Sequence, residues 1–247
     1  MLLDVRDVSK SFGVKVVDAL SVSVAAGDAL GIVGPNGAGK TTLLNLIAGD
    51  LRPDSGAITF DGVDVTRSRT DQRCRLGIGR TSQIPRPFEG MTVFENVLTA
   101  AVYGSGRSLS TGEATDLVAD SLRRAGLLSR ANVAAGTLPL LSRKRLELAR
   151  ALATQPRVLL LDEIAGGLTE GEVDELVATI AAIHADGVTL VWIEHIVHAL
   201  VAVVNRIMAM HYGAKIAEGD PHDVMNSPEV QEIYLGVPLE PAAAEAS

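Results

Sequence analysis

Short, continuously apolar runs recur along the chain and predict the strands of a buried parallel sheet. Such strands are covered on both faces, so they show hydrophobic runs in place of alternation. Segments of helix length lie between and after them, and strands that alternate with helices indicate an α/β fold. The predicted strands are residues 29–33, 157–161, 188–193 and 206–210, and the predicted helices are residues 40–48, 172–185 and 196–203.

The first residues follow a different pattern, because apolar and polar positions alternate there. Residues 3–8 and 14–24 alternate in this way. Residues 57–65 do so on either side of Asp61 and Gly62, a pair typical of turns. Alternation is typical of antiparallel strands that bury one face only, so we predict an antiparallel β-subdomain at the N-terminus.

The middle of the chain shows helical patterns and few strand signals. A Gly- and Ser-rich loop, residues 104–112, interrupts these patterns. The predicted helices are residues 93–103, 113–125 and 142–153. We expect one domain over residues 1–237, with a core lobe (1–84 and 156–237), a helical subdomain (85–155) and then a disordered tail (238–247).

Composition narrows the classes of function. The chain has 247 residues, a formal net charge of −8 and 47 % apolar residues, which suits a globular chain with a sizeable core. The acidic balance and the aromatic content of 3 % argue against nucleic-acid binding through a basic face or through base stacking. The single cysteine, Cys74, excludes a disulfide scaffold and a cysteine-ligated zinc site, and it fits a reducing compartment.

The mean hydropathy of +0.25 raises the question of a membrane span. A spanning helix needs about 18 or more mostly apolar residues in a row. The best candidate, residues 199–210, is short and is interrupted by Asn205 and Arg206. Asp4 and Arg6 lie where a signal peptide requires an apolar run. We therefore expect a chain that neither spans the bilayer nor is exported.

The strongest motif is GPNGAGKTT, which matches G-x-x-x-x-G-K-[ST], follows a predicted strand and opens a predicted helix. Its glycines let several backbone N–H groups point at one anion, and the helix N-terminus adds partial positive charge. We expect Lys40 to reach the β- and γ-phosphates of a nucleoside triphosphate and Thr41 to offer its hydroxyl to Mg²⁺. The predicted nucleotide-binding residues of the motif are Gly34, Pro35, Asn36, Gly37, Ala38, Gly39, Lys40, Thr41 and Thr42.

A second motif, RVLLLDE, ends a predicted strand with two acidic residues. Asp162 lies where it could hold Mg²⁺ through water, and Glu163 lies where it could act as general base on an attacking water. Such a strand end is usually structural, but its pairing with the phosphate loop favours the functional interpretation. Together the two motifs predict a P-loop NTPase core that hydrolyses a nucleoside triphosphate with Mg²⁺.

The order and spacing of further residues resemble the ATP-binding cassette (ABC) family over residues 2–238. Gln83, in RTSQ, matches the family's Q-loop glutamine, which contacts Mg²⁺ and faces the membrane subunit. His195, in VWIEH, matches the switch histidine at the γ-phosphate, and Phe12 matches the aromatic residue that stacks on adenine. The resemblance implies ATP as the nucleotide and catalytic roles for Gln83, Glu163 and His195. The alternative interpretations are that Gln83 faces solvent and that His195 and Phe12 are ordinary core residues.

Within this family the chain resembles the ATP-binding subunits of branched-chain amino acid importers. The resemblance rests on RTSQIPRPFEGMTVFENV, on AGGL after the acidic pair and on YLG at residues 234–236. Related importers carry urea, amides or other small solutes, so the solute stays open. The resemblance implies a second cassette, permease subunits that dock between Gln83 and Met91, and an extracytoplasmic solute-binding protein. It implies no nucleic-acid partner and a peripheral place on the cytoplasmic face of the plasma (inner) membrane.

The family's signature loop, LSGGQ or LSYGQ, is replaced here by LPLLS at residues 138–142. In dimers of the family this loop closes over the phosphate loop of the other chain. Pro139 has neither the hydroxyl nor the N–H that the signature serine presents to the γ-phosphate, and Leu141 adds bulk where backbone must approach closely. Further departures are Ile164 for proline, Thr169 for Asn or Asp, and Ile196 for Asp.

These departures lead to the hypothesis of an asymmetric dimer. The phosphate loop of this chain would be closed by an intact signature of a different cassette, and the opposite site would bind ATP but hydrolyse it poorly. Two alternatives stay open: a slow homodimer that tolerates LPLLS, and an ATP-binding regulatory subunit with little turnover. An ABC ATPase that acts on nucleic acid or ribosomes and a P-loop kinase fit less well, because basic arms are missing and Gln83 and His195 would be coincidences.

Overall fold

The alternating N-terminal segments form an antiparallel sheet of four strands. In the computed structural model, which describes residues 1–235, Leu3 lies opposite both Val24 and Phe60. The predicted third strand is split in two by the turn at Asp61 and Gly62. The strand order is β2 (Val14–Val24), β1 (Leu3–Phe12), β4 (Ser55–Phe60) and β5 (Val63–Asp64).

The continuously apolar runs form a second sheet. Its order is β10 (Ala214–Gly219), β9 (Arg206–His211), β3 (Ala29–Val33), β8 (Thr189–Ile193), β7 (Val158–Asp162) and β6 (Ile78–Arg80). All pairs from β9 to β6 are parallel, and β10 pairs antiparallel with β9. The predicted α/β class with a mainly parallel sheet is therefore confirmed. The sequence did not predict β10, because its residues are half-buried or exposed and lack a continuous apolar run.

Alternate side chains of the parallel strands belong to two separate hydrophobic clusters, one on each face of the sheet. In β3, Leu30 and Ile32 belong to the cluster under the N-terminal sheet, whereas Ala29 and Val33 belong to the cluster on the opposite face. Successive side chains of a strand point to opposite faces, so one short strand contributes to both layers. Both faces of this sheet are covered, which is why the strands show no alternation in sequence.

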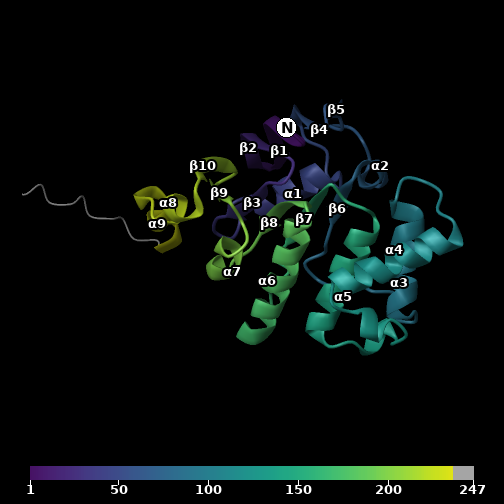
Figure 1. The fold of residues 1–247 in the computed structure, drawn as a ribbon. Coiled ribbons are helices and arrows are strands. Elements are labelled where there is room, and N and C mark those ends of the chain that lie inside the picture. Colours follow the sequence, from purple (N-terminus) through teal and green to yellow (C-terminus); the bar gives the residue numbers. More distant parts are fainter. Residues whose placement is uncertain (236–247) are drawn as a thin grey trace, which may run out of the picture.

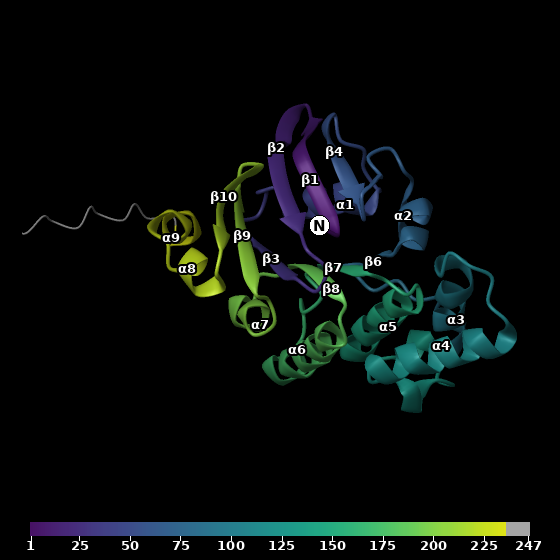
Figure 2. The same ribbon diagram turned by 45° about the horizontal axis from the view of Figure 1, so that its top comes forward.

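Some helices cover the parallel sheet, and others form a separate group beside it (Figure 1). Helix α7 (Val197–Val201) is shorter than predicted, and α6 (Glu170–Ala185) begins two residues earlier than predicted. Helices α2 (Thr70–Leu76), α8 (Pro221–Met225) and α9 (Pro228–Leu235) were not predicted. Helices α3, α4 and α5 lie together, away from α8 and α9 in both views (Figure 2). The helices are α1 (Lys40–Ala48), α2 (Thr70–Leu76), α3 (Val93–Gly104), α4 (Thr111–Arg124), α5 (Leu140–Ala153), α6 (Glu170–Ala185), α7 (Val197–Val201), α8 (Pro221–Met225) and α9 (Pro228–Leu235), with 3₁₀ turns at Leu128–Arg130 and Ala135–Thr137.

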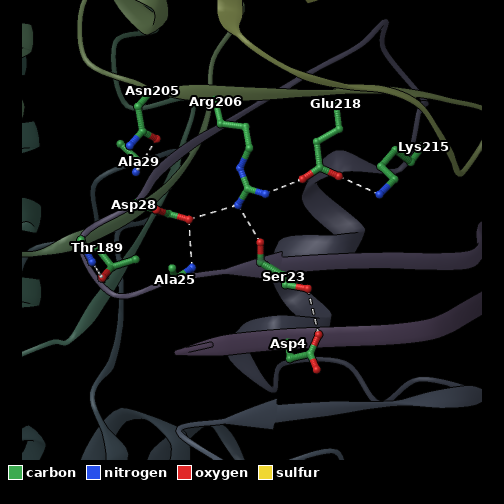
Figure 3. Close-up of polar contacts among 11 residues, drawn as sticks. Asp4, Ser23, Ala25, Asp28, Ala29, Thr189, Asn205, Arg206, Lys215 and Glu218 are labelled. Carbon is green, nitrogen blue, oxygen red and sulfur yellow. Dashed lines mark hydrogen bonds and ion pairs between the residues drawn. The ribbon is translucent and has the colours of Figure 1, made fainter.

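A polar cluster around Arg206 joins the two sheets (Figure 3). The Arg206 guanidinium contacts Glu218 at 2.7 Å, Asp28 at 3.2 Å and the carbonyl oxygen of Ser23 at 2.6 Å. It thereby ties β9 and β10 to the end of β2. Since β3 and β9 both begin here, this cluster lies at the strand ends opposite the phosphate loop, and it is a structural feature.

No helix within residues 1–235 is long and apolar enough to cross a membrane. The predicted disordered tail, residues 238–247, lies outside the described residues.

Candidate functional site

The phosphate loop leaves β3 and turns directly into α1. Gly39, the N-cap of α1, has φ of +97°, and a Cβ there would lie 2.4 Å from the carbonyl oxygen of Val16. A Cβ on Gly34 would lie 2.2 Å from the carbonyl oxygen of Met210. Glycine is required at both positions because β2 and β9 approach the loop this closely. The neighbouring strands thus hold the loop in shape.

Lys40 is buried, with 5 % of its surface exposed, and its ammonium group donates to the carbonyl oxygens of Gly34 at 2.6 Å and Pro35 at 3.0 Å. Burial lowers the pKa of Lys40, while the carboxylates of Glu163 and Asp162 oppose that shift. Hydrogen bonds between charged groups are stronger than bonds to neutral carbonyls, so a phosphate oxygen would be the preferred partner. The pocket beside Lys40 has a volume of about 180 Å³ and is lined by Val16, Asn36, Gly37, Ala38, Gly39, Lys40, Thr41, Thr42 and Glu163.

Asp162 ends β7 next to the first turn of α1. The Thr41 hydroxyl donates to Oδ1 of Asp162 at 3.4 Å, and the side chain of Asp162 is only 2 % exposed. Burial raises the pKa of Asp162, and the Arg80 guanidinium at 3.2 Å opposes that shift. A hydroxyl and a carboxylate are oxygen ligands of the kind that Mg²⁺ prefers. The residues present therefore fit the predicted ion.

The three predicted catalytic residues lie in direct contact. Gln83 Nε2 donates to Glu163 Oε2 at 2.6 Å, and His195 Nε2 lies 2.7 Å from Glu163 Oε1. They follow β6, β7 and β8, and the carboxyl ends of parallel strands meet at one edge of a sheet. The contact is held by the backbone, since Glu163 has φ of +46° and its N–H donates to the carbonyl oxygen of Ile193 at 2.9 Å.

Phe12 lies apart from this group. It ends β1 with 56 % of its surface exposed, and the Lys10 ammonium lies 5.5 Å from its ring centroid. Val16, in β2, lines the pocket, whereas Phe12, in β1, does not. The adenine-stacking role of Phe12 stays a prediction.

Three charged residues at the site were not expected from the sequence. Arg80 pairs with Asp162, and Glu194 is buried and accepts from the backbone N–H groups of Ala165 at 3.2 Å and His195 at 3.3 Å. Lys144, buried in α5, donates to the carbonyl oxygen of Gln83 at 3.5 Å. Arg80 and Glu194 end or follow apolar strands, a position that could have drawn attention to both.

The segment LPLLS forms the N-terminus of α5 and packs into its own chain. Pro139 is the N-cap and offers no side-chain hydrogen bond to the helix. Leu141 is 9 % exposed and belongs to the same large hydrophobic cluster as Ile164, and the partly buried Ile196 packs against that cluster. The departures from the family pattern at these three positions therefore lie in or against one apolar cluster.

The loop before α5 is held in place by a side chain of the helix itself. Arg143 donates to the carbonyl oxygens of Leu138 and Gly136, at 2.8 Å each. Leu140, by contrast, is 40 % exposed, and a Cβ on Gly167 would lie 3.3 Å from its Cδ2 atom. A large apolar side chain thus occupies the position where the family has a small residue.

Comparison with protein families decides the membership of this chain. The family described as "ABC transporter" matches residues 17–166. The chain belongs to the ABC transporter family. Residues 214–239 of this ABC cassette also match the family described as "Branched-chain amino acid ATP-binding cassette transporter". The cassette carries the ATPase domain of its family.

Relatives of known name match the cassette over nearly all of its length. It is 34 % identical to the high-affinity branched-chain amino acid transport ATP-binding protein BraF of Pseudomonas aeruginosa, over 95 % of this chain and 98 % of that protein. It is 36 % identical to the corresponding protein LivG of Salmonella typhimurium, with the same coverage. The crystal structure of the ADP conformation of MJ1267, an ATP-binding cassette of an ABC transporter, has a TM-score of 0.87 at 32 % identity and covers 96 % of this chain and 99 % of that chain.

Proposed function

We propose that this cassette binds ATP with Mg²⁺ and hydrolyses it to drive import of a small solute, a branched-chain amino acid, urea, an amide or a related compound. The observation that carries the proposal is the contact of Gln83 and His195 with Glu163, beside the phosphate-loop pocket. BraF and LivG are named as branched-chain amino acid transport proteins, which supports the solute class.

Each polar group at the pocket has a chemical role in this proposal. Lys40 and the loop N–H groups bind the phosphates. Thr41, Asp162 and the Gln83 amide would hold Mg²⁺, which screens the phosphate charge when bound. Glu163 accepts a proton from the attacking water, and the His195 ring holds the Glu163 carboxylate at 2.7 Å.

The permease subunits would dock on the segment between Gln83 and Met91. Ile84, Phe88 and Met91 are 67 %, 45 % and 41 % exposed, so the segment offers an apolar surface next to a catalytic residue. The cassette would lie at the cytoplasmic face of the inner membrane through this contact. A solute-binding protein would act on the other side of the permease.

The N-terminus of α5 supports an asymmetric pair of cassettes. At the position of the family's phosphate-contacting loop this chain has Leu140, which is 40 % exposed, and Leu141, which belongs to a hydrophobic cluster of its own chain. Pro139 has no N–H to donate. The site that this segment closes on the partner would hold ATP and turn it over slowly. The site on this chain would be closed by an intact signature of a different cassette.

The same segment favours a second candidate, an ATP-binding regulatory subunit with little turnover. Glu163→Gln separates the two, because it removes the general base and leaves the pocket lining in place. We expect Glu163→Gln to abolish phosphate release by the complete transporter, with a decrease of about 100-fold or more, while ATP still binds. An unchanged rate would overturn hydrolysis at this site in favour of the regulatory role.

The dimer is tested by comparing two preparations of the wild-type chain. We expect low phosphate release from the chain alone and a large increase when a cassette with an intact signature and the permease subunits are added. Robust, cooperative hydrolysis by the homodimer would contradict the asymmetric arrangement but not the ATPase proposal.

A further inference from the structure

A line of charged groups and hydroxyls runs from the surface of the cassette to the phosphate loop. At its outer end the hydroxyl of Thr70, the first residue of α2, donates to Asp50 at 3.0 Å. Asp50 forms an ion pair with Arg80, and the other side of the Arg80 guanidinium lies 3.2 Å from Asp162 Oδ2. The second carboxylate oxygen of Asp162 faces the Thr41 hydroxyl. Arg80 is therefore shared between two carboxylates.

The two carboxylates differ in burial. The side chain of Asp162 is 2 % exposed, that of Arg80 23 % and that of Asp50 44 %. Charges interact more strongly where water is excluded, so the inner pair matters more than the outer one. Arg80 also holds the pKa of Asp162 down against the effect of burial.

The line of groups borders a hollow that reaches the segment proposed for permease docking. This hollow has a volume of about 460 Å³. Arg80, Asp50 and Asp162 line it together with Ile84 and Arg86. Gln83 reaches Glu163 from the same segment, so two polar contacts, one through Gln83 and one through Arg80, lead from the hollow to the acidic pair.

We propose that Arg80 is a positioning residue that sets how strongly Asp162 holds the divalent cation, and that Asp50 controls Arg80. The proposal rests on the proposed function, in which Asp162 holds Mg²⁺. Arg80 and the metal ion are two cations that compete for one carboxylate. Asp50 attracts the Arg80 guanidinium toward the surface and the hollow, and so weakens the pairing of Arg80 with Asp162. A permease group that engages Asp50 would therefore change metal binding without touching the nucleotide.

The competition predicts shifts of opposite sign for two neighbouring substitutions. Arg80→Gln removes the competing cation, so the divalent cation should bind more tightly. Asp50→Asn leaves Arg80 with Asp162 as its carboxylate partner among the residues described, so the cation should bind more weakly. Arg80→Lys keeps the charge but loses the second nitrogen that reaches the other carboxylate, so its shift should lie between the wild type and Arg80→Gln. If Arg80 only held β6 in place, its loss would lower the melting temperature without producing this pair of opposite shifts.

The experiment measures Mn²⁺ binding to the full chain in the presence of a non-hydrolysable ATP analogue, by electron paramagnetic resonance of the unbound ion. We expect the half-saturating Mn²⁺ concentration to fall about three- to tenfold in Arg80→Gln and to rise about two- to fivefold in Asp50→Asn. Arg80→Lys should fall between the wild type and Arg80→Gln. The matched control is Arg86→Gln, which removes an arginine that lines the same hollow without an ion pair to Asp162, and which should stay within about twofold of the wild type.

The outcomes separate this proposal from the function on which it rests. Shifts in the same direction, no shift in Asp50→Asn, or an Arg86→Gln shift as large as that of Arg80→Gln would overturn the role of Arg80 while the wild type still binds Mn²⁺ with the analogue. Absence of analogue-dependent Mn²⁺ binding in the wild type would overturn both. Asp50 is partly exposed, so Asp50→Asn still tests the role of Arg80 if Arg80→Gln does not fold.

Discussion

The phosphate-loop region and the N-terminus of α5 are the two parts of this cassette expected to face nucleotide, and they have opposite physical character. The first buries charge: Lys40 and Asp162 are 5 % and 2 % exposed, and each is held by named polar partners. The second buries hydrocarbon, because Leu141 joins the hydrophobic cluster that also contains Ile164. The changed signature therefore places apolar packing at the start of α5, while the charged groups beside the phosphate loop keep their polar partners.

The largest effect on function is expected from Lys40→Met. The substitution removes the buried ammonium group while roughly keeping side-chain volume, so the phosphates lose a charge-assisted bond. We expect ATP affinity to fall about 100-fold, measured by titration with a fluorescent ATP analogue. Lys215→Met is the control, because Lys215 pairs with Glu218 at 2.7 Å and does not line the pocket. An affinity within about threefold of the wild type would show that the loop backbone alone carries binding.

The largest effect on stability is expected from Leu141→Ala. Removing a buried leucine leaves a cavity, so the free energy of unfolding should fall by about 2–5 kcal/mol. Leu140→Ala is the matched control, since Leu140 is 40 % exposed and should cost about 1 kcal/mol or less. Urea denaturation measures both. Equal losses would contradict the assignment of Leu141, rather than Leu140, to the shared core.

A smaller effect is expected from Pro139→Ser, which places a good N-cap residue before α5. A serine oxygen can accept from the first turn of the helix, so stability should rise by about 1 kcal/mol in thermal unfolding. Phosphate release by the chain alone should stay low, because Leu140 and Leu141 remain. Recovery of fast turnover in this single variant would mean that the missing N–H and hydroxyl, not the apolar bulk, limit the homodimer.

The smallest effect is expected from Glu194→Gln. Burial raises the pKa of Glu194, so the ionised carboxylate destabilises the fold above that pKa and the penalty disappears as the pH falls. The amide avoids the penalty, and the melting temperature should rise by about 1–4 °C at pH 8 and by less at pH 5. A lower melting temperature at pH 8 would show that the two backbone hydrogen bonds to Glu194 outweigh its desolvation.

Most of the fold could be predicted, because the spacing and continuity of apolar residues indicate which faces of each helix or strand are buried. The runs that form β3, β7 and β8 are buried on both faces and stand out in the sequence. By contrast, β10 and α2 were missed, since β10 is half-exposed and α2 is short and polar with two arginines. Their positions depend on pairing with β9 and on Arg73, whose buried guanidinium donates to the carbonyl oxygens of Leu46 and Ile47 at the end of α1.

The sequence by itself determined the phosphate loop, the acidic pair and the departures at Pro139 and Leu141, because each is a local pattern whose chemistry follows from residue type and spacing. Only the tertiary structure decided which distant groups meet. It placed Gln83 and His195 on the two oxygens of Glu163, and it shared Arg80 between Asp50 and Asp162. The physical reason is that parallel strands bring remote chain segments to one edge, where burial turns ordinary surface charges into strongly interacting partners.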